Sequence, residues 1–407
     1  MMLLTAGTRG DVEPFLALAR RAAAEGHEVR LGVPDDSGAD LSGIDAVSLN
    51  VLFRGLIPDL TIAPWSLVQH AFTEVRPAMS RMFAASVRET VAFAPDVVVH
   101  HPLVLSAPLA ADGLAIPRVL VEFSPVATPS AQFPASGGPT ATRDLGRYNR
   151  STYAVPRAAA RLFRSEVGRA AALLPGGLAP TVRTPSRATL MAVSPQLLPR
   201  PSDWSSRVHL TGAWFEESTG TAAEPAVADF LRGGRYLVAS FGSMVAGDAG
   251  HRSRIVVAAA RAHGLRALLL TGWGGLELSP ELCAPDVLAV RSAALEPVLR
   301  GASVVLHHGG AGTAHAVARA GVPSVVVPFT ADQPFWGARM HRLGVAAEPV
   351  PARRLTVDTL VPAITDALGR RARALEVERA MRTEDGVRRA VDVIGGTMRD
   401  HPTCRAT

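Results

Sequence analysis

Short apolar runs alternate with amphipathic stretches along most of the chain. Apolar runs between glycine, proline and polar residues are typical of buried strands, and stretches with a period near 3.6 are typical of helices. We expect strands at residues 1–5, 28–33, 96–99, 117–122, 236–240, 266–271, 287–290, 303–306 and 324–327. We expect helices at residues 12–25, 65–94, 103–112, 151–174, 252–263 and 357–395. This alternation predicts an α/β protein with parallel, doubly wound sheets.

Two polar, breaker-rich stretches, at residues 199–203 and 216–225, interrupt the alternation and are typical of a connection between domains. We therefore expect a first domain at residues 1–205, a linker at 206–225 and a second domain at 226–375. In open parallel sheets, ligands bind beyond the carboxyl ends of the strands. Two such domains that face each other would form a binding cleft between their loops.

Composition limits the classes of partner. The 407 residues are 48% hydrophobic and 19% charged, as expected of a folded protein with a sizeable core. The formal net charge is +6, and every basic residue is arginine because the chain contains no lysine. These arginines are scattered and lack an aromatic RNA-binding motif, so we expect no nucleic-acid partner.

No apolar run reaches the roughly 18–20 residues that span a bilayer, and the chain does not begin with a charged and apolar leader. We expect a cytoplasmic protein, with peripheral membrane contact left open. The two cysteines, Cys283 and Cys404, lack CxxC spacing, and the histidines lack metal-ligand spacing. We expect neither a disulfide nor a metal site.

A glycine-rich turn from Leu306 to Thr313 joins an apolar strand to a helix. Glycines at such a turn let the backbone approach a phosphate, and the N–H groups of the following helix favour an anion. Asp332 and Gln333 follow the next strand, where a carboxylate and an amide suit sugar hydroxyls. The turn therefore predicts a diphosphate site beside a sugar site, with a purely structural strand–helix turn as the alternative.

A second loop of interest follows the first strand and contains Gly7, Gly10 and Asp11. Asp11 directly precedes the expected helix, where a carboxylate can cap backbone N–H groups. In a cleft, the same carboxylate can remove a proton from an acceptor hydroxyl. The sequence leaves both roles open.

Three segments closely resemble motifs of the UDP-glycosyltransferase superfamily: Thr5–Pro14, His307–Thr313 and Asp332–Gly337. The similarity extends over nearly the whole chain and is greatest for the bacterial branch that glycosylates antibiotics and sterols. It implies the GT-B fold, in which two Rossmann-like domains with parallel sheets face each other across a cleft. The first domain would bind the acceptor and the second the nucleotide sugar. Residues 376–407 would form a helix that packs back toward the first domain, and a tail.

The resemblance also implies a role for individual residues. Asp11 matches the proposed general base, and Asp332 and Gln333 match the pair that holds hexose hydroxyls. The donor diphosphate would be bound by Ser243, His307, His308, Gly309, Gly310, Gly312 and Thr313. The nucleoside would contact Trp273, Ser292, Ala293, Ala294 and Leu295. The acceptor side would include Thr8, Arg9, Gly10 and His101.

The implied activity is an inverting, metal-independent transfer of a hexose or deoxyhexose from a dTDP or UDP sugar. The acceptor would be a hydroxyl of a hydrophobic secondary-metabolite aglycone in antibiotic biosynthesis. A sterol or lipid UDP-glucosyltransferase is the main alternative, followed by a GT-B-like epimerase and a catalytically silent sugar-nucleotide-binding partner. We expect no cofactor besides the nucleotide-sugar co-substrate, and a monomer or homodimer.

Overall fold

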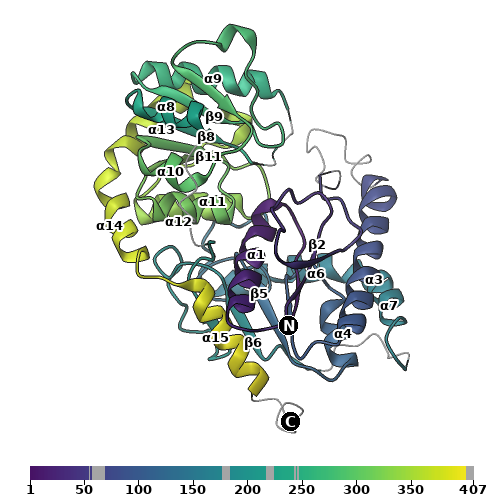
Figure 1. Cartoon of the computed structure of the whole chain (residues 1–407). Helices are drawn as coiled ribbons and strands as arrows, with labels where there is room; N and C mark the ends of the chain where they lie inside the picture. Colours follow the sequence, from purple (N-terminus) through teal and green to yellow (C-terminus); the bar gives the residue numbers. More distant parts are fainter. Residues whose placement is uncertain are drawn as a thin grey trace.

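Two parallel sheets organise the chain (Figure 1), as seen in a computed structural model that describes residues 1–54, 56, 69–176, 184–216, 224–242, 244 and 247–399. The first sheet has the order β3 (Asp45–Ser48), β2 (Arg30–Val33), β1 (Met2–Leu4), β4 (Val98–His100), β5 (Arg118–Glu122), β6 (Ala188–Met191) and β7 (Val208–Leu210). The second has the order β10 (Val287–Val290), β9 (Arg266–Leu270), β8 (Tyr236–Ser240), β11 (Val304–His307) and β12 (Ser324–Val326). The expected α/β class with parallel sheets is confirmed.

Helices cover both faces of the first sheet, so its central strands are buried and apolar on both sides. On one face, α1 (Arg9–Ala24) and α15 (Gly386–Arg399) pack on alternate strand residues such as Leu3 and Val99. On the other face, α3 (Arg76–Phe93), α4 (Ala107–Gly113) and α7 (Arg164–Ala171) pack on Met2 and Val98. The sheet register places residue 3 between Leu31 and Val99, so the two faces alternate residue by residue.

The second sheet is covered in the same way. On one face lie α9 (Ala249–Ala262) and α13 (Val357–Gly369). On the other lie α8 (Pro225–Arg232), α10 (Leu295–Arg300), α11 (Ala311–Arg319), α12 (Gln333–Leu343) and α14 (Arg371–Met381). The buried cluster on this second face also contains Phe133, Leu197 and Trp204 of the first domain. The two domains therefore share an apolar interface.

The chain crosses between the domains twice. β7 pairs with β6, so the first domain extends to Leu210. This corrects the expected linker start at residue 206, which the short β7 and its polar neighbours concealed. α14 spans the boundary drawn at residue 376 and packs on α11, and α15 then packs on α1. The return to the first domain comes at residues 382–385.

Short helical turns complete the fold: η1 (Ala71–Val75), η2 (Gly146–Tyr148), α5 (Asn149–Thr152), α6 (Ala154–Arg161), η3 (Pro280–Leu282) and η4 (Ala352–Arg354). Within the described ranges, no helix is both long enough and apolar enough to cross a bilayer.

Candidate active site

Each motif lies at the carboxyl edge of its sheet. The loop with Asp11 follows β1, and His101 follows the neighbouring β4. In the second sheet, Trp273, His308 and Asp332 follow β9, β11 and β12. The N-terminal part of α1 approaches α11 across the domain boundary (Figure 1), so the two sets of loops face each other.

Asp11 lies in the first turn of α1, where it forms a capping box with Thr8. Thr8 is the N-cap, and its backbone N–H donates to Asp11 Oδ2 at 2.8 Å. Asp11 is therefore the third residue of the helix and does not precede it. Oδ1 of Asp11 forms no hydrogen bond with any residue that the structure describes, and the side chain is partly exposed. One carboxylate oxygen is thus held in place while the other is free.

Gly7 makes this position of Asp11 available. Its φ is +129°, a backbone conformation that side chains disfavour, and an added Cβ would overlap the Asp11 carboxylate. The hydroxyl of Thr5 donates to the backbone carbonyl of Asp11 at 2.8 Å and fixes the other side of the loop. The strand end and the glycine together orient the carboxylate toward the domain boundary.

The electrostatics of Asp11 link the two domains. Burial raises the pKa of the Asp11 carboxyl to about 7; the hydrogen bond from the Thr8 backbone opposes this shift, and the negative charge of Asp332 adds to it. Burial also raises the pKa of Asp332 to about 6. Carboxylates from opposite domains are therefore close enough to interact.

His307 is fully buried at the end of β11, and its hydrogen bonds define its tautomer. Its Nδ1 accepts the backbone N–H of Gly309 at 3.2 Å, so the ring proton lies on Nε2. Burial lowers the pKa of His307 to about 3, which keeps the ring neutral. Nε2 has no hydrogen-bond partner within the described part of the chain. A buried donor without an acceptor is costly, and an anionic ligand at this edge would satisfy it.

The glycine turn after His307 is sterically required. Gly309 has a φ of +92°, and an added Cβ would lie 2.6 Å from Val326 Cγ1. An added Cβ on Gly310 would lie 2.6 Å from Nε2 of His308, whose ring packs close to the turn. Gly312, in the first turn of α11, faces open space. The N–H groups of that first turn have no intrahelical acceptors, so the turn offers an anion site beside His307.

Asp332, the N-cap of α12, contacts the N-terminus of α11. Its carboxylate accepts a hydrogen bond from the backbone of Ala311, and its Oδ2 accepts the indole N–H of Trp336 at 3.0 Å. The Trp336 ring is fully buried, and its centroid lies 5.0 Å from that of His315 at 76°. The buried Trp336 therefore holds the Asp332 carboxylate in one orientation through its indole N–H.

His315 connects α11 to the first domain. Its Nε2 accepts the backbone N–H of Ser194 at 3.2 Å, and its Nδ1 contacts the carbonyl oxygen of Ala311 at 2.7 Å. The Ser194 hydroxyl donates to Glu384, in the segment that returns to the first domain. Trp336 and His315 were not among the expected site residues. Only the spacing of four residues between Asp332 and Trp336 could have indicated the first of these contacts.

The Gln333 side chain is engaged within its own turn. Its side-chain oxygen accepts the backbone N–H groups of Phe329 and Thr330 at 2.8 and 3.1 Å, and its amide nitrogen lies 3.4 Å from Met244 Sδ. The side chain is only 4% exposed. In this arrangement it stabilises the turn before α12, and a contact with the donor sugar stays a prediction.

The comparisons with known proteins agree with this geometry. The family model for the glycosyltransferase family 28 N-terminal domain matches residues 1–126, and that for the C-terminal domain of erythromycin biosynthesis protein CIII-like proteins matches residues 281–388. O-mycaminosyltylonolide 6-deoxyallosyltransferase of Streptomyces fradiae is 32% identical, over 96% of this chain and 96% of that protein. The chain belongs to the UDP-glycosyltransferase superfamily.

Sterol 3-beta-glucosyltransferases are also similar to this glycosyltransferase. One from Arabidopsis thaliana is 28% identical over 96% of this chain, which spans only 66% of that longer protein. The solved structure titled the glycotransferase of kitacinnamycin has a TM-score of 0.73 with 20% identity, and each chain is covered to 98%. SnogD from Streptomyces nogalater has a TM-score of 0.64 with 23% identity, over 98% of this chain and 99% of that one. The similarity to these structures confirms the expected GT-B fold.

The nucleoside residues expected in the glycosyltransferase lie along the carboxyl edge of β9 and β10. The guanidinium of Arg54, from the first domain, lies 4.9 Å from the ring centroid of Trp273. Ala294 is the N-cap of α10, with Leu295 as the first helical residue and Ser292 and Ala293 just before it. Ser243, expected at the diphosphate, lies outside the described residues.

On the acceptor side of the glycosyltransferase, Thr8 is engaged with Asp11, and Gly10 is exposed. Arg9 forms an exposed ion pair with Glu13 at 2.5 Å, so its charge is partnered within α1. The His101 ring stacks on Phe123, with a centroid distance of 5.8 Å and an angle of 24°. Burial lowers the pKa of His101 to about 3, and it forms no hydrogen bond with Asp11 in the described structure. His101 therefore lies on the acceptor side as a neutral ring stacked on Phe123.

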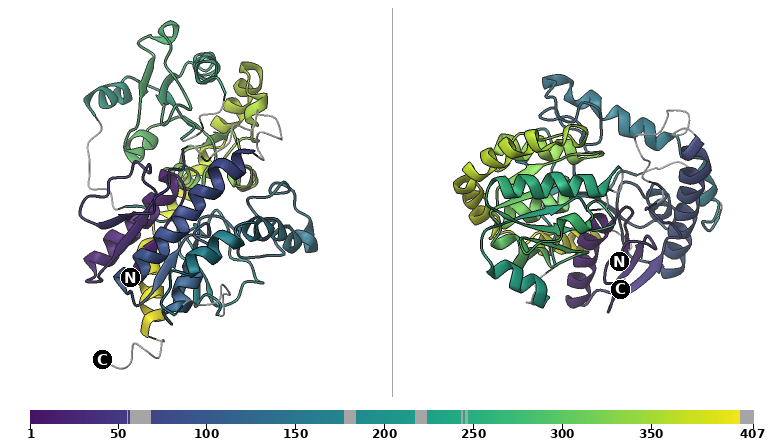
Figure 2. Two further views of the ribbon diagram at one scale, coloured as in Figure 1. Left: turned by 90° about the vertical axis from the view of Figure 1, so that its right-hand side faces the viewer. Right: turned by 90° about the horizontal axis from the view of Figure 1, so that it is seen from above.

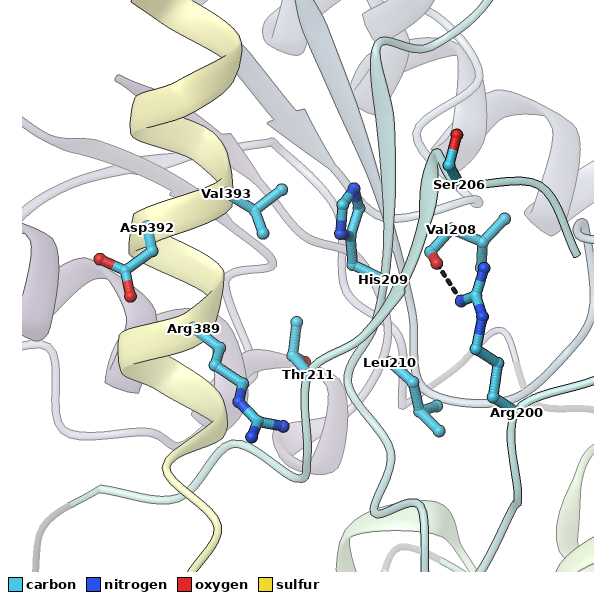
Figure 3. A pocket seen from close by; sticks show the side chains of 9 residues that line it. All are labelled: Arg200, Ser206, Val208, His209, Leu210, Thr211, Arg389, Asp392 and Val393. Atoms are coloured by element: carbon cyan, nitrogen blue, oxygen red, sulfur yellow. Dashed lines mark hydrogen bonds between the residues drawn. The ribbon is translucent and has the colours of Figure 1, made fainter.

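A cavity of about 440 Å³ lies elsewhere, between β7 and α15 (Figure 3). Its lining includes Arg200, His209, Arg389 and Val393, and none of the residues expected at the active site. Arg200 donates to the carbonyl oxygen of Val208 and so covers part of the free edge of β7. This hollow belongs to the outer surface of the first domain of the glycosyltransferase.

Proposed function

We propose that this glycosyltransferase is an inverting, metal-independent enzyme that moves a hexose or deoxyhexose from a dTDP or UDP sugar to a hydroxyl of a hydrophobic secondary-metabolite aglycone. The observation that carries this proposal is the Asp11 carboxylate, which has one free oxygen and faces the second domain across the cleft. The similarity to a 6-deoxyallosyltransferase supports a deoxyhexose donor and a natural-product acceptor.

In the proposed reaction, Oδ1 of Asp11 removes the proton of the acceptor hydroxyl. The hydroxyl oxygen attacks the anomeric carbon, and the bond from that carbon to the diphosphate oxygen breaks on the opposite face. A pKa of about 7 suits this step, because the carboxylate is ionised near neutral pH and is still basic enough to accept a proton. Attack opposite the leaving group inverts the anomeric centre.

The leaving diphosphate gains negative charge, and the second domain supplies fixed donors for it. These are the Nε2–H of His307 and those N–H groups of the first turn of α11 that Asp332 does not accept. Preorganised donors in a buried site stabilise such charge without reorganisation. We propose that they take the place of a metal ion. No three His, Cys, Asp or Glu side chains come together as a ligand set in the described part of the chain.

The test of the donor site is thermal stabilisation by dTDP, UDP and GDP at saturating concentration. A ligand that binds only the native protein raises its stability by about 2.7 kcal/mol when present at a hundred times its Kd. We expect dTDP or UDP to raise the melting temperature. No shift with any nucleotide would contradict the donor site, and a His307→Ala variant with an unchanged shift would contradict its diphosphate contact.

The same measurement separates two acceptor classes. A preference for dTDP supports transfer of a deoxysugar to an antibiotic aglycone. A preference for UDP favours the alternative, a sterol or lipid glucosyltransferase, for which the similarity to plant and fungal sterol glucosyltransferases is the supporting observation. The anomeric configuration of the product, read by NMR, then tests inversion.

The pKa of Asp11 predicts opposite pH profiles for activity and stability. We expect kcat/KM to rise about tenfold per pH unit below the pKa and to level off above about pH 7, as the base ionises. The native protein binds this proton more tightly than the unfolded chain does, so the contribution to stability is present below pH 3.8 and is lost as the pH rises to about 7. Initial rates and urea unfolding at matched pH values measure the two profiles. A flat rate profile across this range would contradict the assigned base.

A further inference from the structure

The helical turns from residue 146 to 171 form an arm that stands out from the first domain in both views of Figure 2. The arm comprises η2, α5, α6 and α7. α6 has no buried residue, although helices on globular proteins normally bury an apolar face. α7 attaches the arm to the domain through Ala170, which packs under α3. α5 is also anchored, through the buried Asn149 and Thr152, so α6 is the part of the arm that presents its side chains outward.

Large apolar side chains lie at regular intervals on this arm. Tyr148, Val155 and Leu162 are 58, 49 and 72% exposed, and they are seven residues apart. Seven residues are close to two helical turns, so Val155 of α6 and Leu162, its C-cap, lie along one side of that helix. Tyr148 ends the separate turn η2. Phe72, on η1, is 59% exposed, and the guanidinium of Arg76 covers its ring at 5.2 Å. Because Arg76 also contacts the carbonyl oxygen of Leu162 at 3.5 Å, Phe72 adjoins the end of the same apolar stripe.

Unbalanced positive charge surrounds the stripe. Residues 146–164 contain five arginines and neither Asp nor Glu. Arg157, Arg161 and Arg164 form no ion pair with any of the residues described. Arg147 lies over the Tyr148 ring at 4.9 Å and donates to its hydroxyl, which keeps a charge beside that aromatic ring. Separated apolar side chains among free guanidinium groups are the pattern of an interfacial membrane helix.

We propose that this arm docks the protein on an anionic lipid bilayer. Val155, Leu162 and Phe72 enter the headgroup region, and the arginines pair with lipid phosphates. A second copy of the chain is a poor occupant of this face, because it would bring the same arginines against each other. The stripe is projecting and interrupted, which suits insertion between lipids better than packing against a rigid protein surface.

Co-sedimentation with phosphatidylcholine vesicles, with and without phosphatidylglycerol, tests the proposal independently of transfer activity. Each arginine near an anionic surface contributes about fivefold to partitioning. We expect binding only to the anionic vesicles, and a loss of about 100-fold in the R157Q/R161Q/R164Q variant. The matched control is R353Q/R354Q/R379Q, which removes three arginines that are also exposed and form no described ion pair, but on the second domain. It should bind as the unmodified protein does.

A V155S/L162S variant tests the apolar part, and because both side chains are exposed it should fold normally. Weaker binding at unchanged charge supports insertion. Equal binding to neutral and anionic vesicles, equal loss in both arginine triples, or no binding to anionic vesicles at low salt would each overturn the proposal. The last outcome would direct attention to an acidic protein partner.

Discussion

Asp11→Asn should abolish sugar transfer while nucleotide binding persists. The amide retains an oxygen to accept the Thr8 N–H, so the capping box and the fold are preserved, but the free atom can no longer take a proton. A positioned general base contributes about 10²–10⁴ to the rate, so we expect kcat to fall by that factor. Initial rates and the nucleotide-induced thermal shift, measured on the same preparation, give the two readouts.

Glu13→Gln is the matched control, since it removes an exposed carboxylate of the same helix whose one ion pair among the described residues is with Arg9. It should leave kcat nearly unchanged. If Asp11→Asn instead lowers the melting temperature and weakens nucleotide binding to the same degree as activity, Asp11 is only a helix cap. The sequence left base and cap open as alternatives, and the structure shows how one oxygen can serve each role.

Trp336→Ala should destabilise the protein by about 3–5 kcal/mol, the usual cost of truncating a buried tryptophan. Trp336→Phe should keep most of the packing but lose the hydrogen bond to Asp332, at a cost of about 1.5–3 kcal/mol for a bond to a charged group. Because Asp332 is one of the residues expected to bind the donor sugar, the phenylalanine variant should also raise the KM for the donor. Urea unfolding and donor titrations measure these effects.

Trp204→Phe is a suitable control. Trp204 is buried in the same interdomain cluster, but its indole nitrogen has no hydrogen-bond partner among the described residues. It should lose little stability and leave the donor KM unchanged. Equal effects of the two phenylalanine substitutions on KM would show that packing at the interface, and not the contact with Asp332, controls donor binding.

The sequence predicted the parallel alternation and the position of each motif at the carboxyl edge of a strand, because both depend on local patterns. It missed β3, β6 and β7, and β6 (Ala188–Met191) fell between the strands expected at residues 117–122 and 236–240. The two end residues of β3 are exposed, and its Ala46 and Val47 are only partly buried, so it lacks the apolar run of a central strand. β7 has three residues between polar stretches, and its pairing with β6 depends on a tertiary contact.

Side-chain direction was the other limit of the sequence. Nothing local indicates that the Gln333 oxygen accepts two backbone N–H groups of its own turn, or that His315 reaches Ser194 of the other domain. Asp11 was expected before its helix, because Gly10 suggested a break there; instead Arg9 and Gly10 are already helical. These details arise from packing between segments far apart in the chain.

The two crossings between the domains have a mechanical consequence. They touch each other: an added Cβ on Gly386 would lie 2.6 Å from the carbonyl oxygen of Gly212 and 2.5 Å from that of Ala213. Two connections in contact at one place are the usual arrangement of a domain hinge, which favours rotation of the domains over sliding. A rotation of one domain relative to the other would therefore be centred near these two connections. Glycine at residue 386 allows the two backbones to come into contact. A side chain at this position would collide with the carbonyl oxygens of Gly212 and Ala213 and force the two connections apart.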